Sequence, residues 1–87
     1  MILDRIIISR NLNDLMENQS GIVIGYNRTC PLYVKEYFLY LGFNSGVRIK
    51  ASCVSPFEDS RAYIMSGKKL TVRKKDAEYI LVSCFSE

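Results

Sequence analysis

Apolar and polar positions alternate with a period of two in several short stretches of the chain. After Gly21, the residues Ile22, Ile24 and Tyr26 share one parity, which predicts a first core strand with these side chains inward. The next such stretch is cleaner, because the polar residues Arg48, Lys50 and Ser52 alternate with Val47, Ile49, Ala51 and Cys53. Successive side chains of a strand point to opposite faces of a sheet, so this stretch predicts a half-buried antiparallel strand.

One helix is expected between these two strands. Pro31 suits a first helical turn, and the apolar residues Val34, Phe38 and Leu41 recur at the spacing of one helix face. Gly42 stands where a left-handed C-terminal cap is expected. The pattern therefore predicts a helix of about three turns.

The C-terminal half predicts three more strands. Residues 61–65 form a strand that carries Ala62 and Ile64 inward, and the following Ser66-Gly67 favours a tight hairpin. The partner strand, residues 68–73, places Leu70 and Val72 on the core side. Residues 75–78 predict one helical turn before a final strand over residues 79–85.

The length of 87 residues fits a single domain, residues 1–87. Residues 1–10 are expected to form an extra N-terminal strand, and residues 11–87 the core; Asn11 or Asn13 can cap a short helical turn between the two. Closing a sheet removes edges that a small chain cannot otherwise protect. We therefore expect a mainly β fold: a small SH3-like barrel of about five or six antiparallel strands, with a helix inserted after the first core strand.

The composition argues against an enzyme. The sequence contains no histidine, which removes the commonest general base and metal ligand. The three cysteines, Cys30, Cys53 and Cys84, are widely spaced, so we expect free thiols and no disulfide framework. Cys30, at the start of the helix, is the one candidate for reactivity, although we favour an inert thiol there. We expect no catalytic residue, no cofactor and no metal site.

No signal peptide or membrane-spanning stretch is recognised, which together with the free thiols favours a cytoplasmic protein without direct membrane insertion. The formal net charge is +3, and five basic residues are clustered near the C-terminus: Lys68, Lys69, Arg73, Lys74 and Lys75. Such a cluster can bind phosphates, but Asp76 and Glu78 offset it. A solvated hairpin is the preferred interpretation, so we expect no nucleic-acid partner.

The helix carries a second stripe beside its core positions. Tyr33, Tyr37 and Tyr40 recur at i, i+4 and i+7. These tyrosines either lie over the barrel mouth with their hydroxyl groups in water or form a docking surface, since tyrosine is enriched in interface cores. With Phe57 of the adjacent loop, they are the candidate partner-binding residues.

From the helix onward, the chain resembles the FeoA family of ferrous iron transport protein A. The residues that carry the resemblance are Leu41-Gly42-Phe43, Gly46-Val47, Ser55-Pro56, Asp59, Tyr63, Gly67, Leu70, Val72-Arg73, Asp76-Ala77-Glu78 and Ile80. The resemblance implies an SH3-like barrel and a role at the membrane Fe(II) transporter FeoB, on its cytosolic region. In the family, the residues that precede the Leu-Gly pair are usually rich in arginine, whereas this helix presents tyrosines. This difference suggests a diverged contact with the partner or a homodimer.

The leading hypothesis is a non-enzymatic, cytosolic accessory protein that binds or modulates FeoB. One alternative is an SH3-like regulatory module linked to metal sensing or peptide binding, since the chain also resembles the C-terminal domain of metal-dependent repressors. Another alternative is a small barrel that binds nucleic acid through the basic cluster.

Overall fold

The computed structural model describes residues 7–53 and 59–85, and for residues 7–9, 53 and 85 it describes the backbone alone. Its strands are β1 (Ile7–Asn11), β2 (Ser20–Tyr26), β3 (Arg48–Cys53), β4 (Ser60–Met65), β5 (Lys68–Arg73) and β6 (Ile80–Phe85). Its helices are the 3-10 turn η1 (Leu12–Asp14), α1 (Leu32–Leu41) and the short α2 (Lys74–Ala77). Residues 1–6 of the expected N-terminal strand over residues 1–10 lie outside the described residues, and β1 runs from Ile7 to Asn11.

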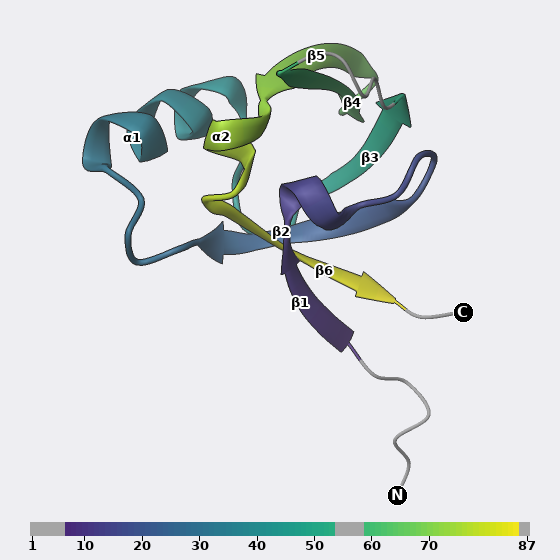
Figure 1. The fold of residues 1–87 in the computed structure, drawn as a ribbon, viewed down its shortest axis with the longest axis horizontal. Coiled ribbons are helices and arrows are strands. Elements are labelled where there is room, and N and C mark those ends of the chain that lie inside the picture. The colour runs from purple at the N-terminus through teal and green to yellow at the C-terminus, as the bar shows by residue number, and fades with distance from the viewer. Residues whose placement is uncertain (1–6, 54–58, 86–87) are drawn as a thin grey trace, which may run out of the picture.

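The strands form one six-stranded antiparallel sheet in the order β1-β6-β2-β3-β4-β5. The sheet curls strongly, so that β4 and β5 arch over β2 and β6, while α1 lies at one end (Figure 1). This arrangement confirms the expected mainly β, SH3-like fold with a helix inserted after the first core strand.

The two outer strands of the sheet, β1 and β5, pair with one neighbour each in the described part of the chain. The space between them is occupied by the two short helices, since α2 contacts both β5 and η1, and η1 contacts β1. We call this region the seam. Main-chain ladders thus form most of the barrel wall, and the seam completes it by other contacts.

The side chains of β2 that point into the core differ from those predicted. Val23 is fully buried, whereas Ile22 is half-buried and Ile24 is 42% exposed. Gly21 takes the preceding inward position because its backbone lies close to β6, where an added Cβ would be 3.1 Å from the Ser83 carbonyl oxygen. A register shift between Val23 and Gly25 then returns Tyr26 to the edge of the core.

The prediction of which β4 side chains point into the core was also wrong. Tyr63 is fully buried and Met65 and Arg61 almost so, while Ala62 is half-buried and Ile64 is 38% exposed. Both parities of this strand contain apolar side chains, so alternation alone could not select the inward one. The larger side chains, Tyr63 and Met65, fill the core.

Other predicted facings are confirmed. Ile49 and Ala51 of β3 and Val72 of β5 are buried, and Leu70 packs partly against the core. The prediction for the Cys53 side chain lies outside the described residues. Asn11 caps η1, with its side-chain oxygen accepting a hydrogen bond from the Asn13 amide.

The helix α1 has the predicted core stripe and end. Phe38 is buried, and its ring meets that of Phe43 edge-on at a centroid distance of 5.2 Å. Val34 and Leu41 pack partly against the core. Gly42 ends the helix in the left-handed region, with φ of 106°, and its amide donates to the carbonyl of Leu39.

Candidate functional site

The outer side of α1 exposes a group of large side chains that we call the aromatic face: Tyr33, Tyr37 and Tyr40, with Leu32 at the first turn. Tyr40 is 86% exposed, Tyr33 is 75% and Tyr37 is 59%. The core stripe points the other way, because Phe38 and its neighbours at the same helical spacing pack on the sheet. The predicted tyrosines are therefore brought together on one accessible surface, and their binding role stays a prediction.

Two further residues of this surface were not singled out from the sequence. Leu32 is 68% exposed, and Glu36 is exposed at the position between Tyr33 and Tyr40 on the same helical side. A carboxylate therefore lies among the aromatic rings. The remaining predicted contact, Phe57, lies outside the described residues.

The seam is the second candidate site. Three side chains join its strands and helices by hydrogen bonds to main-chain carbonyl oxygens. Asn13 Nδ2 donates to Lys74 O at 2.7 Å, Arg61 Nη1 donates to Asn13 O at 3.0 Å, and the Tyr63 hydroxyl donates to Leu12 O at 3.3 Å. Because each bond spans more than forty residues of sequence, these contacts tie η1 to β4 and α2.

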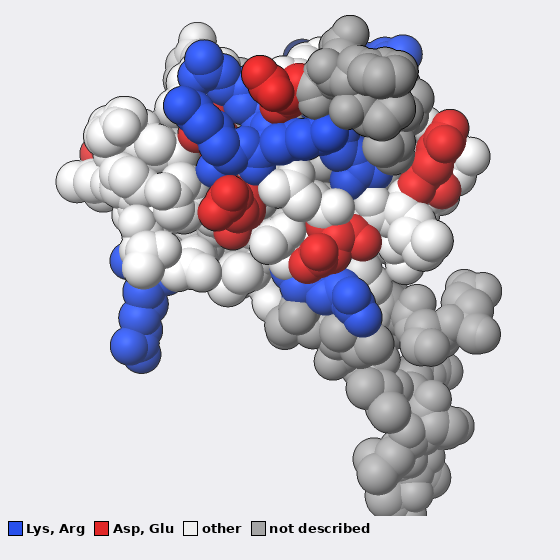
Figure 2. Space-filling view, in the orientation of Figure 1, with Lys and Arg blue, Asp and Glu red and all other residues white. Residues whose placement is uncertain are grey.

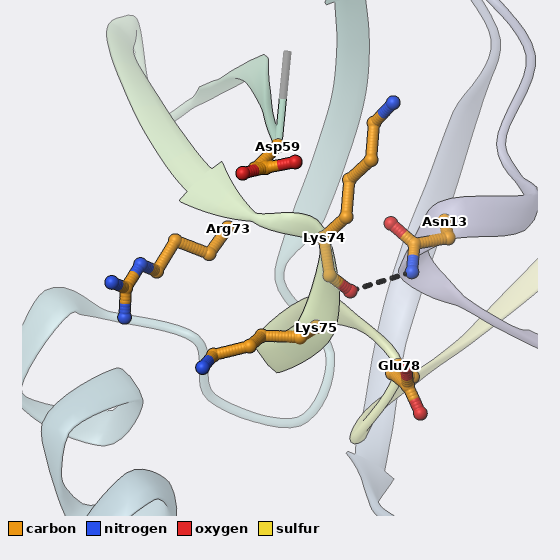
Figure 3. Close-up of a pocket in the computed structure, with 6 residues that line it drawn as sticks. All are labelled: Asn13, Asp59, Arg73, Lys74, Lys75 and Glu78. Carbon is orange, nitrogen blue, oxygen red and sulfur yellow. Dashed lines mark hydrogen bonds between the residues drawn. The ribbon is translucent and has the colours of Figure 1, made fainter.

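Two hollows open on the seam. The larger has a volume of about 480 Å³ and is lined by Asn13, Asp59, Arg73, Lys74, Lys75 and Glu78, whose side chains Figure 3 shows around it. The second, of about 370 Å³, is lined by Asn13, Leu15, Arg61 and Lys74. The two hollows share Asn13 and Lys74.

The charge around the seam is mixed. Lys and Arg side chains gather over β5 and α2, with Asp and Glu side chains close beside them (Figure 2). The larger hollow has three cationic and two anionic lining residues. This surface is therefore not the uniform basic stripe that binding a nucleic-acid backbone usually requires.

The described cysteines are poor nucleophiles. Burial raises the pKa of the Cys30 thiol, an effect that outweighs the opposite influence of Lys35, and the Sγ atom donates to the Pro31 carbonyl at 3.4 Å. Burial likewise raises the pKa of Cys84, which is 5% exposed. Both thiols therefore stay protonated at neutral pH.

Within residues 7–53 and 59–85, no group of three or more Cys, Asp or Glu side chains is arranged to hold a metal ion. In the same part of the chain, no helix has the length and hydrophobicity needed to cross a membrane.

Structural comparison identifies several similar proteins. The NMR structure of a FeoA-like protein from Clostridium acetobutylicum is 26% identical, with a TM-score of 0.79 over 91% of this chain and 90% of that one. FeoA from Stenotrophomonas maltophilia, solved with zinc and described as a prokaryotic SH3 domain protein, is 16% identical, with a TM-score of 0.71 over 83% of this chain and 87% of that one.

A manganese-dependent transcriptional repressor, 16% identical, gives a TM-score of 0.78 over 87% of this chain but only 41% of its own. At that identity the likeness shows the fold alone.

No curated protein sequence gives a significant match. The model of the FeoA domain matches residues 10–84, which is most of the chain. The chain therefore belongs to the FeoA domain family.

Proposed function

We propose that this protein is a non-enzymatic, cytoplasmic accessory factor of ferrous iron transport that binds the cytosolic region of a FeoB-type transporter. The family assignment supports the link to iron transport. The description of the similar Stenotrophomonas maltophilia protein suggests that it acts as a bacterial ferrous iron transport activating factor. The absence of histidine and the protonated thiols support a role without catalysis.

The observation that carries the proposal is the aromatic face. Three tyrosines that expose more than half of their surface project from one side of a ten-residue helix. Tyrosine supplies a large contact area with only two side-chain torsions to immobilise, so such residues often dominate the energy of an interface. Since the opposite side of α1 is already packed on the core, this side is free to bind a partner.

The partner surface should match this chemistry. Leu32 and the tyrosine rings favour an apolar patch, and the Tyr hydroxyl groups and Glu36 favour hydrogen-bond donors or a cation at its rim. A homodimer through the same face would bring the two Glu36 carboxylates toward a shared interface. Their repulsion favours a different protein as the partner.

The test is a titration of the transporter's isolated cytosolic domain, followed by NMR or calorimetry. Replacing Tyr37 and Tyr40 with Ser should weaken binding by about tenfold or more for each change. The matched control is Met16→Ser, because Met16 is 72% exposed but lies outside α1. Circular dichroism would verify folding, since the Tyr37 ring also contacts Phe38 at 5.5 Å.

Unchanged binding by the folded double variant would remove the aromatic face from the proposal. Sedimentation of the protein alone, over a range of concentrations, distinguishes the homodimer. A dimer that both tyrosine changes dissociate would replace the transporter by a second copy as the occupant of this face.

A further inference from the structure

Arg61 buries a charge that the described residues do not fully pair. Its side chain is 5% exposed and lines the smaller hollow at the seam. Nη1 donates to the Asn13 carbonyl, but Nε and Nη2 are buried and have no hydrogen-bond partner among the described residues. Buried guanidinium groups are normally paired, because an unmet ionic donor loses its hydration without compensation.

The two unmet nitrogens lie on one edge of the guanidinium group. Their N–H bonds are nearly parallel, and this planar fork matches the spacing of two oxygens of a phosphate or carboxylate. The group is also held in place, because Nη1 is bonded to η1 and the Tyr63 ring centroid lies 5.3 Å from Cζ. The fork is therefore oriented before any anion arrives.

Asn13, which lines the same hollow, has a hydrogen-bond acceptor without a partner among the described residues. Its Nδ2 atom donates to Lys74 O, which fixes the orientation of the amide, and leaves Oδ1 buried with no donor among the described residues. A ligand that satisfies all three atoms must offer two acceptor oxygens and one hydroxyl donor. Monohydrogen phosphate has this combination, whereas sulfate and simple carboxylates at neutral pH lack the hydroxyl group.

The surrounding charge also favours an anion. The adjoining larger hollow is lined by Arg73, Lys74 and Lys75 and by the acidic residues Asp59 and Glu78, and Arg61 adds a positive charge in the smaller hollow. The positive excess is small, which suits one compact anion better than a polyanionic backbone.

We propose that the smaller hollow at the seam is a phosphate-binding site, in which the Nε and Nη2 atoms of Arg61 bind two phosphate oxygens and Asn13 Oδ1 accepts from the phosphate hydroxyl. Both nitrogens and Asn13 Oδ1 are shielded from solvent in this structure, so phosphate binding requires the side chains that line the hollow to move apart. Since Asn13 belongs to η1, phosphate binding is coupled to the position of η1 against β4.

The test uses the whole protein and inorganic phosphate at constant ionic strength, with NMR detection of the Arg61 Nε–H signal. We expect a saturable shift of this signal and of the Asn13 amide, with a dissociation constant in the millimolar range or tighter. Chloride at the same ionic strength should produce neither shift. Absence of a saturable Arg61 shift at phosphate concentrations on the order of tens of millimolar would overturn the proposal.

Two variants define the site. Arg61→Met keeps an unbranched apolar stem but removes the fork, so it should abolish the saturable response at Asn13. Arg48→Met removes the same charge from an exposed position on β3 and should leave the response intact. An equal loss in both variants would mean that phosphate senses only net charge, which contradicts the site. If Arg61→Met does not fold, the wild-type Arg61 signal alone decides.

The source of the phosphate is distinguished by methyl phosphate, whose dianion has no hydroxyl group. We expect it to bind about tenfold more weakly than inorganic phosphate, because Asn13 Oδ1 would stay unmet. Equal binding would overturn the assigned role of Asn13 and favour a phosphate ester as the ligand.

Discussion

The hydrogen bond from Tyr63 to Leu12 offers a direct measure of how the seam holds the barrel together. Tyr63 is fully buried on β4, and its hydroxyl donates to the Leu12 carbonyl of η1 across the seam. Replacing Tyr63 with Phe removes this bond and keeps the ring. The change therefore removes the polar contacts of the hydroxyl group at the seam, with Leu12 and with the Arg61 guanidinium, and leaves the packing of the ring in place.

The structure sets the expected magnitude. The donor–acceptor distance of 3.3 Å is long for a hydroxyl donor, which places the bond near the weak end of the usual range. The Leu12 carbonyl also accepts from the Leu15 amide, so it keeps a partner after the substitution. The penalty of an orphaned buried acceptor, up to about 3 kcal/mol, is thus avoided, and we expect a loss of about 1 kcal/mol.

Urea denaturation measures this loss. For a domain of this size, about 1 kcal/mol corresponds to a fall of about 1 M in the urea midpoint and of about 4–8 °C in Tm. Tyr37→Phe, which removes an exposed hydroxyl group, is the control and should change stability by less than about 0.5 kcal/mol. A loss above about 3 kcal/mol would refute the reasoning that the Leu12 carbonyl keeps a partner, and no loss would refute a contribution of the Tyr63 bond to stability.

Three further outcomes are expected. Gly42→Ala should lower the free energy of unfolding, measured by urea denaturation, by about 1–2 kcal/mol, because φ at Gly42 is 106°. Ser45→Ala is the control. Equal stabilities of the Gly42→Ala and Ser45→Ala variants would contradict this prediction. Burial raises the pKa of Tyr26 from 10.0 to about 12, so its contribution to stability is complete below pH 10 and is lost as the pH rises toward 12. Tyr26→Phe should reduce the dependence of the unfolding free energy on pH between pH 10 and 12. An unchanged pH dependence would exclude Tyr26 as the cause. In mass-mapped thiol labelling, Cys84 should react only on unfolding, whereas rapid native labelling would show that its strand opens.

Much of the fold is readable from local signals. The helix stop at Gly42, the cap at Asn11 and the hairpin at Ser66-Gly67 each depend on a residue whose backbone or side chain favours one conformation. The strands of the C-terminal half also fall close to their predicted bounds. The facings of β2 and β4 do not, because each strand has apolar residues at both parities and only the partner surface selects one.

The candidate sites divide in the same way. The tyrosine stripe of α1 follows from spacing alone, because a helix places residues three and four apart on one side. Arg61 was missed, since a charged residue next to Ala62 is expected to face solvent. No local signal distinguishes it from the exposed arginines of other strands.

The sequence by itself determined the kinds and order of elements, the helix with its exposed tyrosines and the lack of histidine chemistry. These features depend on periodicity and on residue types, which act over a few neighbours. Only the tertiary structure decided which sides of β2 and β4 face inward, how η1 and α2 complete the wall, and that Arg61 is buried at the seam. Those outcomes depend on contacts between residues far apart in the chain, where burial and hydrogen bonding outweigh local preference.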